Sequence, residues 1–443
     1  QRQMCIRDSL KDLQAMRDRL LGTHGVPADP DSFLVKTGRV FRTVNYLRLL
    51  GGQTLSSLPD AGRLVARHGL VRTGAKLARL MSSAEVRKLS ADEAHRFGTA
   101  LEYVLDTRAD TLADIGNEQV GSRMDKILRR EANRFSRVTG MASWNSALKT
   151  IATALEQDSI VRAAKGGSLK GFDQAKLAEL GLGEEMLERI GGELKKHGKD
   201  VEGLMRSNSQ AWTDRQAAFA FESAIRKSAD TVVLTKGVGD TPLFMSTEMG
   251  KTLFQFKSFG MAAVNRLLIP MSQGIAHGDI ATVNGGLVML TLGAFANAAR
   301  DWAAGKEPAT EPWRIAIEAF DRAGFTTFMA EPIDAISGTV GGPRFGRFTS
   351  QSPFESLTGP TFGTAEDIYK TIQGMFTEQG EFAPGVKAND VYRFRKLLPY
   401  QNLFYLRRVV NGIEGEFSEA IGAEGAGVES FSGRVGETTP LKR

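Results

Sequence analysis

The sequence predicts a mainly α fold: an elongated assembly of many helices with Gly- and Pro-rich loops and little or no sheet. In several stretches, apolar residues recur at the three- and four-residue spacing of a helix face. Glycine, at 48 of 443 residues, often follows directly after such a stretch, where it can end a helix. Strand and helix patterns do not alternate, so an α/β domain is not expected.

The first half of the chain is expected to form a series of amphipathic helices. Ser83 can cap the first of them, and Glu85 lies in its first turn. A single run, DTVVLT at 230–235, has the composition of a strand. The expected helices are 82–106, 124–138, 141–164, 184–197 and 212–228.

A long amphipathic helix is expected from about residue 247, and an apolar segment follows at 280–299. Twenty uncharged residues reach about 30 Å as a helix. Three interpretations of this segment stay open: the core helix of a soluble bundle, a segment that inserts into a membrane only under special conditions, and a permanent membrane span. The amphipathic stripe consists of Leu253, Phe256, Phe259, Gly260, Ala263 and Leu267.

The last part of the chain is rich in turns. We expect a loop at 341–363 that docks its aromatic side chains onto helices, then short helices at 364–376 and from 389 onward. Pro399 should end one helix, with Asn402 as the cap of the next. The expected regions are a basic helical region (10–81), a helical bundle (82–230), amphipathic and apolar helices with possible membrane activity (231–340), a loop-rich region (341–421) and a disordered tail (422–443).

The first nine residues, QRQMCIRDS, lack apolar periodicity and contain Cys5, the only cysteine of the chain. One codon series for this stretch resembles the transposon mosaic-end adapter used to prepare sequencing libraries. We therefore expect 1–9 to be an adapter scar, with a genuine disordered N-terminal tail as the alternative. On this hypothesis the chain is a C-terminal piece of a longer protein, with no native cysteine in the part present here.

The basic residues are unevenly placed. The net charge is +6, but residues 32–84 contain nine Lys and Arg and a single acid, Asp60. Such a block suits phosphate, of nucleic acid or of lipid head groups, and the alternative is a solvated helix face. The residues of the block that we predict to contact phosphate are Arg63, Arg67, Arg72, Lys76 and Arg79.

Two further stretches mix aromatic and basic residues, as surfaces that stack bases or lie at a membrane interface do. The alternative is that the rings belong to the core and the bases only flank it. The first stretch contains Phe254, Phe256, Lys257, Phe259 and Arg266. The second contains Tyr392, Arg393, Phe394, Arg395, Lys396, Tyr400, Phe404, Tyr405, Arg407 and Arg408.

No enzymatic, metal or cofactor site is expected. The stretch EMGKT ends like a phosphate-binding loop but has Met245 where that loop needs glycine. KGVGDTP fails as a dinucleotide fingerprint because Pro242 stands at its third glycine position. The five His are scattered and cysteine pairs are absent from the sequence, so it favours neither a zinc site nor a disulfide framework.

Several blocks, taken together, resemble the C-terminal region of very large internal virion proteins of short-tailed bacteriophages and prophages, also called DNA-ejection proteins. Some related regions lie in large polyvalent phage proteins. The blocks extend over most of the chain: RDRLLGT (17–23), LRLLGGQTLSSLPDAGRLVARHGL (47–70), FSRVTGMASWNSALK (135–149), GDTPLFMSTEMGKTLFQFKSFGMAAVNR (239–266) and LLPYQNLFYLRRV (397–409).

The resemblance implies a protein made in the host cytoplasm and carried in the capsid, which leaves ahead of the genome and joins a conduit across the host envelope. The implied partners are other internal virion and portal proteins, double-stranded DNA, the host inner membrane and further copies of the chain. Any transglycosylase domain of such a protein lies toward its other end. The alternative is a DNA-associated polyvalent protein, delivered with the genome and without a membrane role.

Overall fold

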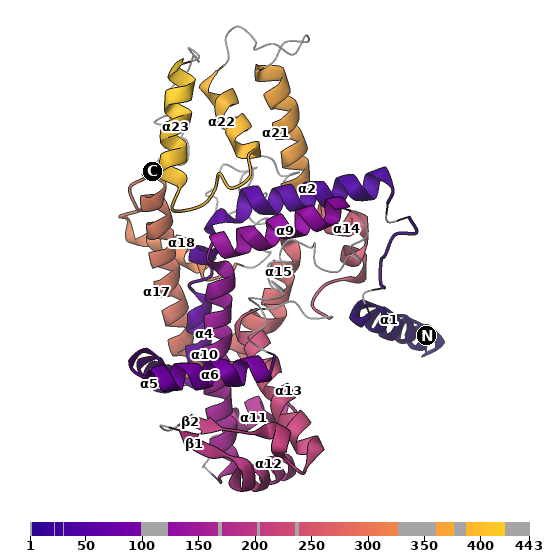
Figure 1. Cartoon of the computed structure of the whole chain (residues 1–443), viewed down its shortest axis with the longest axis vertical. Coiled ribbons are helices and arrows are strands. Elements are labelled where there is room, and N and C mark those ends of the chain that lie inside the picture. Colours follow the sequence, from indigo (N-terminus) through magenta and orange to yellow (C-terminus); the bar gives the residue numbers. More distant parts are fainter. Residues whose placement is uncertain are drawn as a thin grey trace.

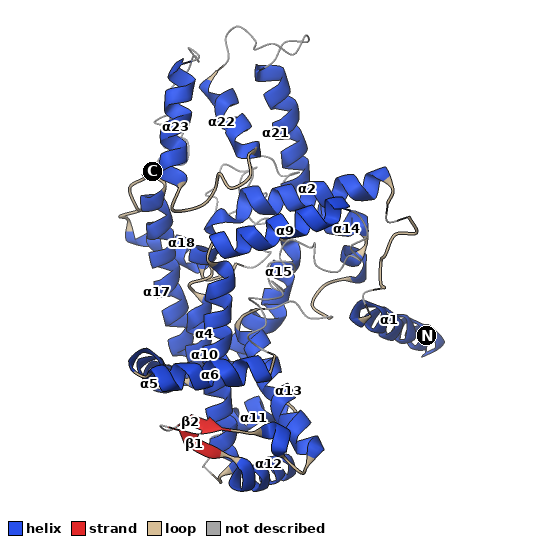
Figure 2. Cartoon of the chain, viewed as in Figure 1, coloured by secondary structure: helices blue, strands red, loops and turns tan. Residues whose placement is uncertain are grey.

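The protein is built almost entirely of helices in its computed structural model (Figures 1 and 2), which confirms the mainly α prediction. Within the described residues, the only sheet is a hairpin in which β1 (Lys199–Val201) runs antiparallel to β2 (Leu204–Arg206). The structure describes residues 2–21, 23–29, 31–98, 123–166, 171–201, 204–234, 239–326, 360–375 and 387–420.

The described elements form an elongated body (Figure 1). At one end lie α21 (Pro360–Met375), α22 (Ala388–Leu397) and α23 (Arg407–Ala420). The β-hairpin lies at the other end, beside α11 (Gly171–Glu179) and α12 (Glu184–His197). The expected elongated shape is therefore visible along the axis that joins these two groups.

Helix α10 (Met141–Ala164) is the central element and contributes to several separate apolar clusters. Leu155 packs with Leu64 and Val232, Ala154 with Leu80, and Ile160 with residues of α12. A helix with apolar residues around most of its circumference is buried on most sides. Its neighbours are α4 (Asp60–His68), α5 (Leu70–Ser82), α6 (Ala84–Arg96) and α13 (Arg215–Val232).

The helices expected in the first half are largely confirmed. The bounds of α10 and α12 match the prediction, and α9 (Arg123–Val138) begins one residue early. Ser83 caps α6, its Oγ accepting from the Val86 N–H at 3.2 Å. Helix α6 ends at Arg96, and residues 99–106 of the expected helix lie outside the described residues. Helix α13 begins at Arg215, not at 212, because Asp214 caps it.

The predicted strand at 230–235 is wrong over the part that the structure describes. Asp230 to Val232 form the last turn of α13, and Val233 follows it without any exposed surface. The β-branched side chains pack against α4 and α10, and this burial overrides their strand preference. The β1–β2 hairpin was not predicted.

The predicted continuous helix from residue 247 is also wrong. Helix α14 (Glu248–Leu253) ends before Phe256, which has a left-handed φ of +69°. The chain resumes as α15 (Lys257–Ala263), a π-helical segment η5 (Val264–Leu268) and α16 (Ile269–Ala276). Phe256 packs on the cluster around Tyr46 and Phe135, so the expected stripe does not lie on one straight helix.

The apolar segment expected at 280–299 forms α17 (Ile280–Ala303), which has one packed and one exposed side. The packed side lies against α4 at Gly285, where a Cβ would come within 2.4 Å of Ala66. Helix α18 (Pro312–Arg322) covers another part. By length and composition α17 could cross a membrane. The large apolar side chains that it exposes are Ile280, Val283, Leu287, Phe295 and Trp302.

The helix break at Pro399 is confirmed, because α22 ends at Leu397 and α23 begins only at Arg407. Asn402 does not cap α23, so that prediction is wrong; its side chain instead donates to the Leu49 carbonyl at 2.9 Å. Residues 341–359 and the tail 422–443 lie outside the described residues. The remaining elements are α1 (Arg2–Leu20), α2 (Phe33–Leu49), η1 (Leu50–Gly52), α3 (Gln53–Ser56), η3 (Ser209–Ala211) and η4 (Leu243–Ser246).

Candidate phosphate-binding site

The arginines on α2 are buried and bind other helices. Arg42 has no exposed surface and donates to Thr252 Oγ1 at 2.7 Å and Glu248 Oε2 at 2.9 Å, both on α14. Arg39 pairs with Asp125 of α9 at 3.2 Å. Arg48 also has its donors engaged with neighbouring helices. A buried guanidinium needs such partners, so this part of the basic block is internal framework.

Two of the predicted contact residues on α4 also face inward. Arg63 is 5% exposed and donates to the carbonyls of Thr231 and Arg266, at 2.7 and 3.0 Å. Its predicted role as a surface contact for phosphate is corrected for this reason. Arg67 donates through Nε to Glu156 Oε2 at 2.8 Å. Burial of Glu156 opposes its ionisation, but nearby positive charge, chiefly that of Arg67, and hydrogen bonds from Arg67 and Ser228 together outweigh the burial and lower its pKa to about 2.

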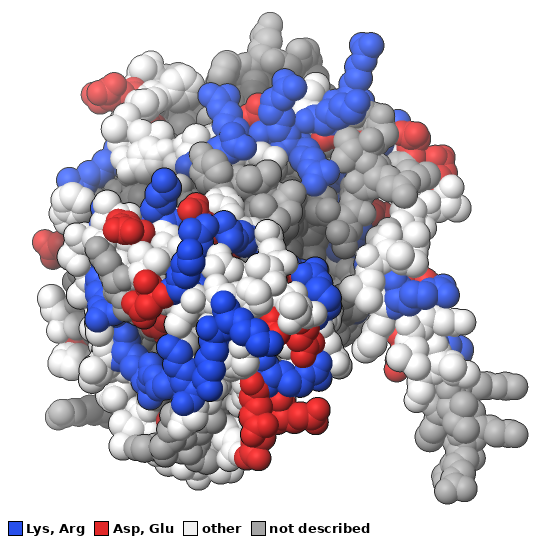
Figure 3. Space-filling view, turned by 60° about the horizontal axis from the view of Figure 1, so that its bottom comes forward, with Lys and Arg blue, Asp and Glu red and all other residues white. Residues whose placement is uncertain are grey.

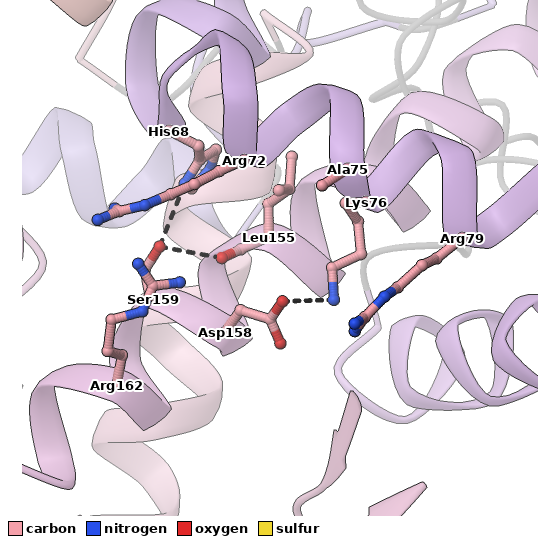
Figure 4. Close-up of a pocket in the computed structure, with 9 residues that line it drawn as sticks. All are labelled: His68, Arg72, Ala75, Lys76, Arg79, Leu155, Asp158, Ser159 and Arg162. Carbon is pink, nitrogen blue, oxygen red and sulfur yellow. Dashed lines mark hydrogen bonds and ion pairs between the residues drawn. The ribbon is translucent and has the colours of Figure 1, made fainter. Parts of the chain in front are cut away.

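The cations of α5, by contrast, line a pocket. Gly69 joins α4 to α5 with a φ of +86°, which favours glycine. Arg72, Lys76 and Arg79 follow at positions i, i+4 and i+7, so they share one face of α5. That face looks onto α10 (Figure 4), and the cavity between the two helices has a volume of about 220 Å³.

The opposite wall of the pocket comes from α10. It consists of Leu155, Asp158, Ser159 and Arg162. Lys76 is 5% exposed, and its ammonium forms an ion pair with Asp158 at the centre of the pocket (Figure 4). Burial raises the pKa of Asp158, and hydrogen bonding and charge from Lys76 oppose that rise. Lys76 therefore lies at the back of the pocket and not at its rim.

His68 closes the pocket at the end of α4. Its Nδ1 lies 3.3 Å from Ser159 Oγ, and its Nε2 lies 3.7 Å from Glu156 Oε2. Burial lowers the pKa of His68 to about 4, so the ring is neutral near pH 7. The positive charge of the pocket thus comes from its Arg and Lys side chains.

Arg72 and Arg162 are the most accessible donors of the pocket. Both are exposed, and neither has a hydrogen bond or ion pair with any residue that the structure describes. In Figure 4 they lie on one side of the pocket, and Lys76 and Arg79 lie on the other. Lys and Arg side chains gather over the lower face of the molecule in Figure 3, with a few acids between them.

The first aromatic–basic stretch makes contacts within the protein. Phe254 packs edge-on against Phe244, with ring centroids 5.3 Å apart, while Phe256 joins a core cluster. Arg266 donates to Asp240 Oδ2 at 2.6 Å. Lys257 begins α15, and the side chain of Phe259 lies outside the described part. None of these residues lines the pocket.

The basic residues of the second stretch are mostly paired with acids. Arg395 pairs with Glu414 at 2.9 Å, and its guanidinium lies 5.0 Å from the centre of the Tyr392 ring. Lys396 pairs with Asp367 at 3.1 Å. Arg393 pairs with an acid as well, Asp390, at 3.3 Å. Burial lowers the pKa of Arg407.

The remaining rings of this stretch also contact the protein itself. The Tyr400 hydroxyl donates to Glu131 Oε2 and the Tyr405 hydroxyl to the Val138 carbonyl, each at 3.1 Å. Phe404 packs edge-on against Tyr405. Phe394 is 39% exposed. Arg408 lies 4.9 Å from the centre of the Trp302 ring. The stretch therefore ties α22 and α23 to the body and does not converge on the pocket.

Arg162, Asp158, Ser159 and His68 were not predicted. Asp158 and Arg162 lie at i and i+4 of α10, which places them on one helix face. That spacing alone is common on solvated helices and does not indicate a pocket. Only the packing of α5 on α10, some 80 to 90 positions apart in sequence, reveals the site.

Among the residues that the structure describes, no three His, Cys, Asp or Glu side chains lie close enough together to hold a metal ion. Comparison of the chain with protein-family models, with curated proteins and with solved structures finds no match. The site is thus characterised by its geometry alone: a pocket lined by four cations and one acid, Asp158, with His68 beside Ser159 at one end.

Proposed function

We propose that this chain is a non-enzymatic C-terminal segment of a phage internal virion protein, which contacts DNA phosphate while it helps form the conduit for genome ejection. The observation that supports it best is the α5–α10 pocket, with exposed Arg72 and Arg162 at its rim. The resemblance of the sequence blocks supports the phage context. Arginine guanidinium groups suit phosphate oxygens because they donate in a planar fork.

The DNA contact is tested by the salt dependence of duplex affinity. Each neutralised phosphate releases counterions, so the logarithm of the association constant falls by about 0.9 per contact and per tenfold rise in salt. A slope of about −2 to −4 is expected for the whole chain. A slope near zero, or no binding at low salt, would contradict the proposal.

The membrane contact is assigned to the exposed side of α17. Its row of Ile280, Leu287 and Phe295 is apolar, and Trp302 lies near the end of the helix, as aromatic residues do at a membrane interface. We expect the chain to bind vesicles of anionic lipid and residues 267–299 to become protected from protease there. Leu287→Glu with Phe295→Glu should abolish this protection, whereas replacing exposed Lys126 and Arg130 by Gln should not.

The alternative is a DNA-associated polyvalent protein delivered with the genome. The two proposals differ only in the vesicle-binding experiment: DNA binding without vesicle binding at low salt would favour the polyvalent protein. The genes next to this one separate the two proposals independently. Portal, tail and other internal virion genes would support the ejection protein, with its location first in the capsid and then in the host envelope.

A further inference from the structure

The pocket carries more positive charge than one DNA phosphate needs. Four cations line it, namely Arg72, Lys76, Arg79 and Arg162, and Asp158 is the single anion. The lining charge is therefore four minus one, or +3, because His68 is neutral near pH 7. A phosphodiester of duplex DNA carries a charge of only about −1, and it is spread along an extended backbone.

The pocket is also concave. Its cations come from two helices and from both sides of the opening (Figure 4), so they can surround one group and not only follow a surface. A diester phosphate offers two free oxygens and continues into a chain on both sides. A terminal phosphate offers three acceptor oxygens and a charge of about −1.5 to −2 near pH 7.

The donors are arranged for such a group. Arg72 and Arg162 have no partner among the described residues and are exposed on the same side of the opening. Lys76 lies behind them with its ammonium on Asp158. A bound anion would therefore meet two unengaged guanidinium forks at the rim and a buried ammonium at the back, each forming charge-assisted hydrogen bonds.

We propose that the α5–α10 pocket binds a terminal phosphate or a pyrophosphate group, with Arg72 and Arg162 as its principal ligands. The group has two possible sources: the 5′-phosphate at the end of a DNA strand, or a soluble nucleoside di- or triphosphate. The inference rests on the proposed phosphate-binding function of this site. It narrows that function from backbone contact to recognition of a chain end or a free nucleotide.

The test is isothermal titration calorimetry of the whole chain with pyrophosphate, and with dimethyl phosphate as the singly charged diester. Pyrophosphate should bind saturably at one site, and dimethyl phosphate should bind much more weakly, as a single backbone phosphate would. Arg72→Gln with Arg162→Gln should weaken pyrophosphate binding at least about tenfold, because the two changes remove two donors of charge-assisted hydrogen bonds from the site.

The matched control is Lys126→Gln with Arg130→Gln on α9, which removes two exposed cations away from the pocket. This pair should leave pyrophosphate affinity unchanged within about twofold. Asp158→Asn should raise the affinity, since it removes the only anion of the pocket. Equal losses in the pocket and control pairs, or equal binding of the two phosphates, would overturn the inference.

Competition experiments with two duplexes and with ATP separate the two sources of the phosphate group. If chain ends are the ligand, a duplex with 5′-phosphates should compete with pyrophosphate better than the same duplex with 5′-hydroxyls. If soluble nucleotides are the ligand, ATP should compete and the two duplexes should behave alike. Duplex binding without any pyrophosphate binding would overturn this inference alone, whereas loss of both would also remove the proposed DNA contact.

Discussion

Two parts of the same basic block have opposite environments. The arginines of α2 are buried and paired with other helices, as Arg42 is with Glu248 at 2.9 Å. The α5 side chains Arg72 and Arg79, about 30 residues further along, are exposed at the rim of a pocket. The comparison shows that a cluster of positive charge in a sequence can contain two populations. One population holds helices together, and the other lies at the surface around a pocket.

The largest expected effect comes from the buried population. Arg42→Ala should lower the free energy of unfolding by about 3 kcal/mol, because it leaves Glu248 partly buried without its main partner. Urea unfolding followed by circular dichroism measures this. Arg72→Ala is the matched control from the same sequence block. If Arg42→Ala lowers the free energy of unfolding by less than about 1 kcal/mol, the buried arginines would not differ in stability from the exposed ones.

A smaller effect is expected from His68, which lies between the two populations. The pKa of His68 is about 4 in the folded chain, below its ordinary value of 6.5. Between pH 6.5 and pH 4 the unfolded chain therefore binds a proton at this ring and the folded chain does not. The contribution of the neutral His68 ring to the free energy of unfolding is fully present above pH 6.5 and is lost as the pH falls toward 4. Between pH 7.5 and 4.5 the wild type should lose roughly 2–3 kcal/mol more than His68→Gln.

Urea unfolding at the two pH values measures the His68 contribution. Parallel losses in the wild type and in His68→Gln would show that the ring is protonated as easily in the folded as in the unfolded chain. Such a result would contradict the burial of His68 at the end of the pocket.

The smallest effect on stability is expected at the pocket rim. Arg72→Ala and Arg162→Ala remove exposed side chains without partners among the described residues, so each should change the free energy of unfolding by less than about 0.5 kcal/mol. Thermal and urea unfolding measure this. A loss near that of Arg42→Ala would place these arginines with the internal framework instead.

The sequence predicted the helices better than the site. The 3.6-residue periodicity is local, so α10 and α12 could be placed at their observed bounds. Whether Arg63 or Arg72 faces solvent depends on α13, η5 and α10, which are distant in sequence. The same reason explains the wrong strand prediction over 230–234, where Val232 and Val233 pack on α4 and α10. Arg162 was missed because nothing near it in sequence indicates the approach of α5.

The most direct test of the central claim is a comparison of two charge-reversal triples in duplex DNA binding. One replaces Arg72, Arg79 and Arg162 at the pocket by Glu, and the other replaces Lys126, Arg130 and Arg134 on α9, which are exposed as well. Both change the net charge by −6. The account predicts that the pocket triple weakens binding at least about tenfold more than the α9 triple does. It also predicts that the pocket triple makes the negative salt slope less steep by about 2. Equal losses in the two triples would contradict it, because DNA would then sense only the total charge.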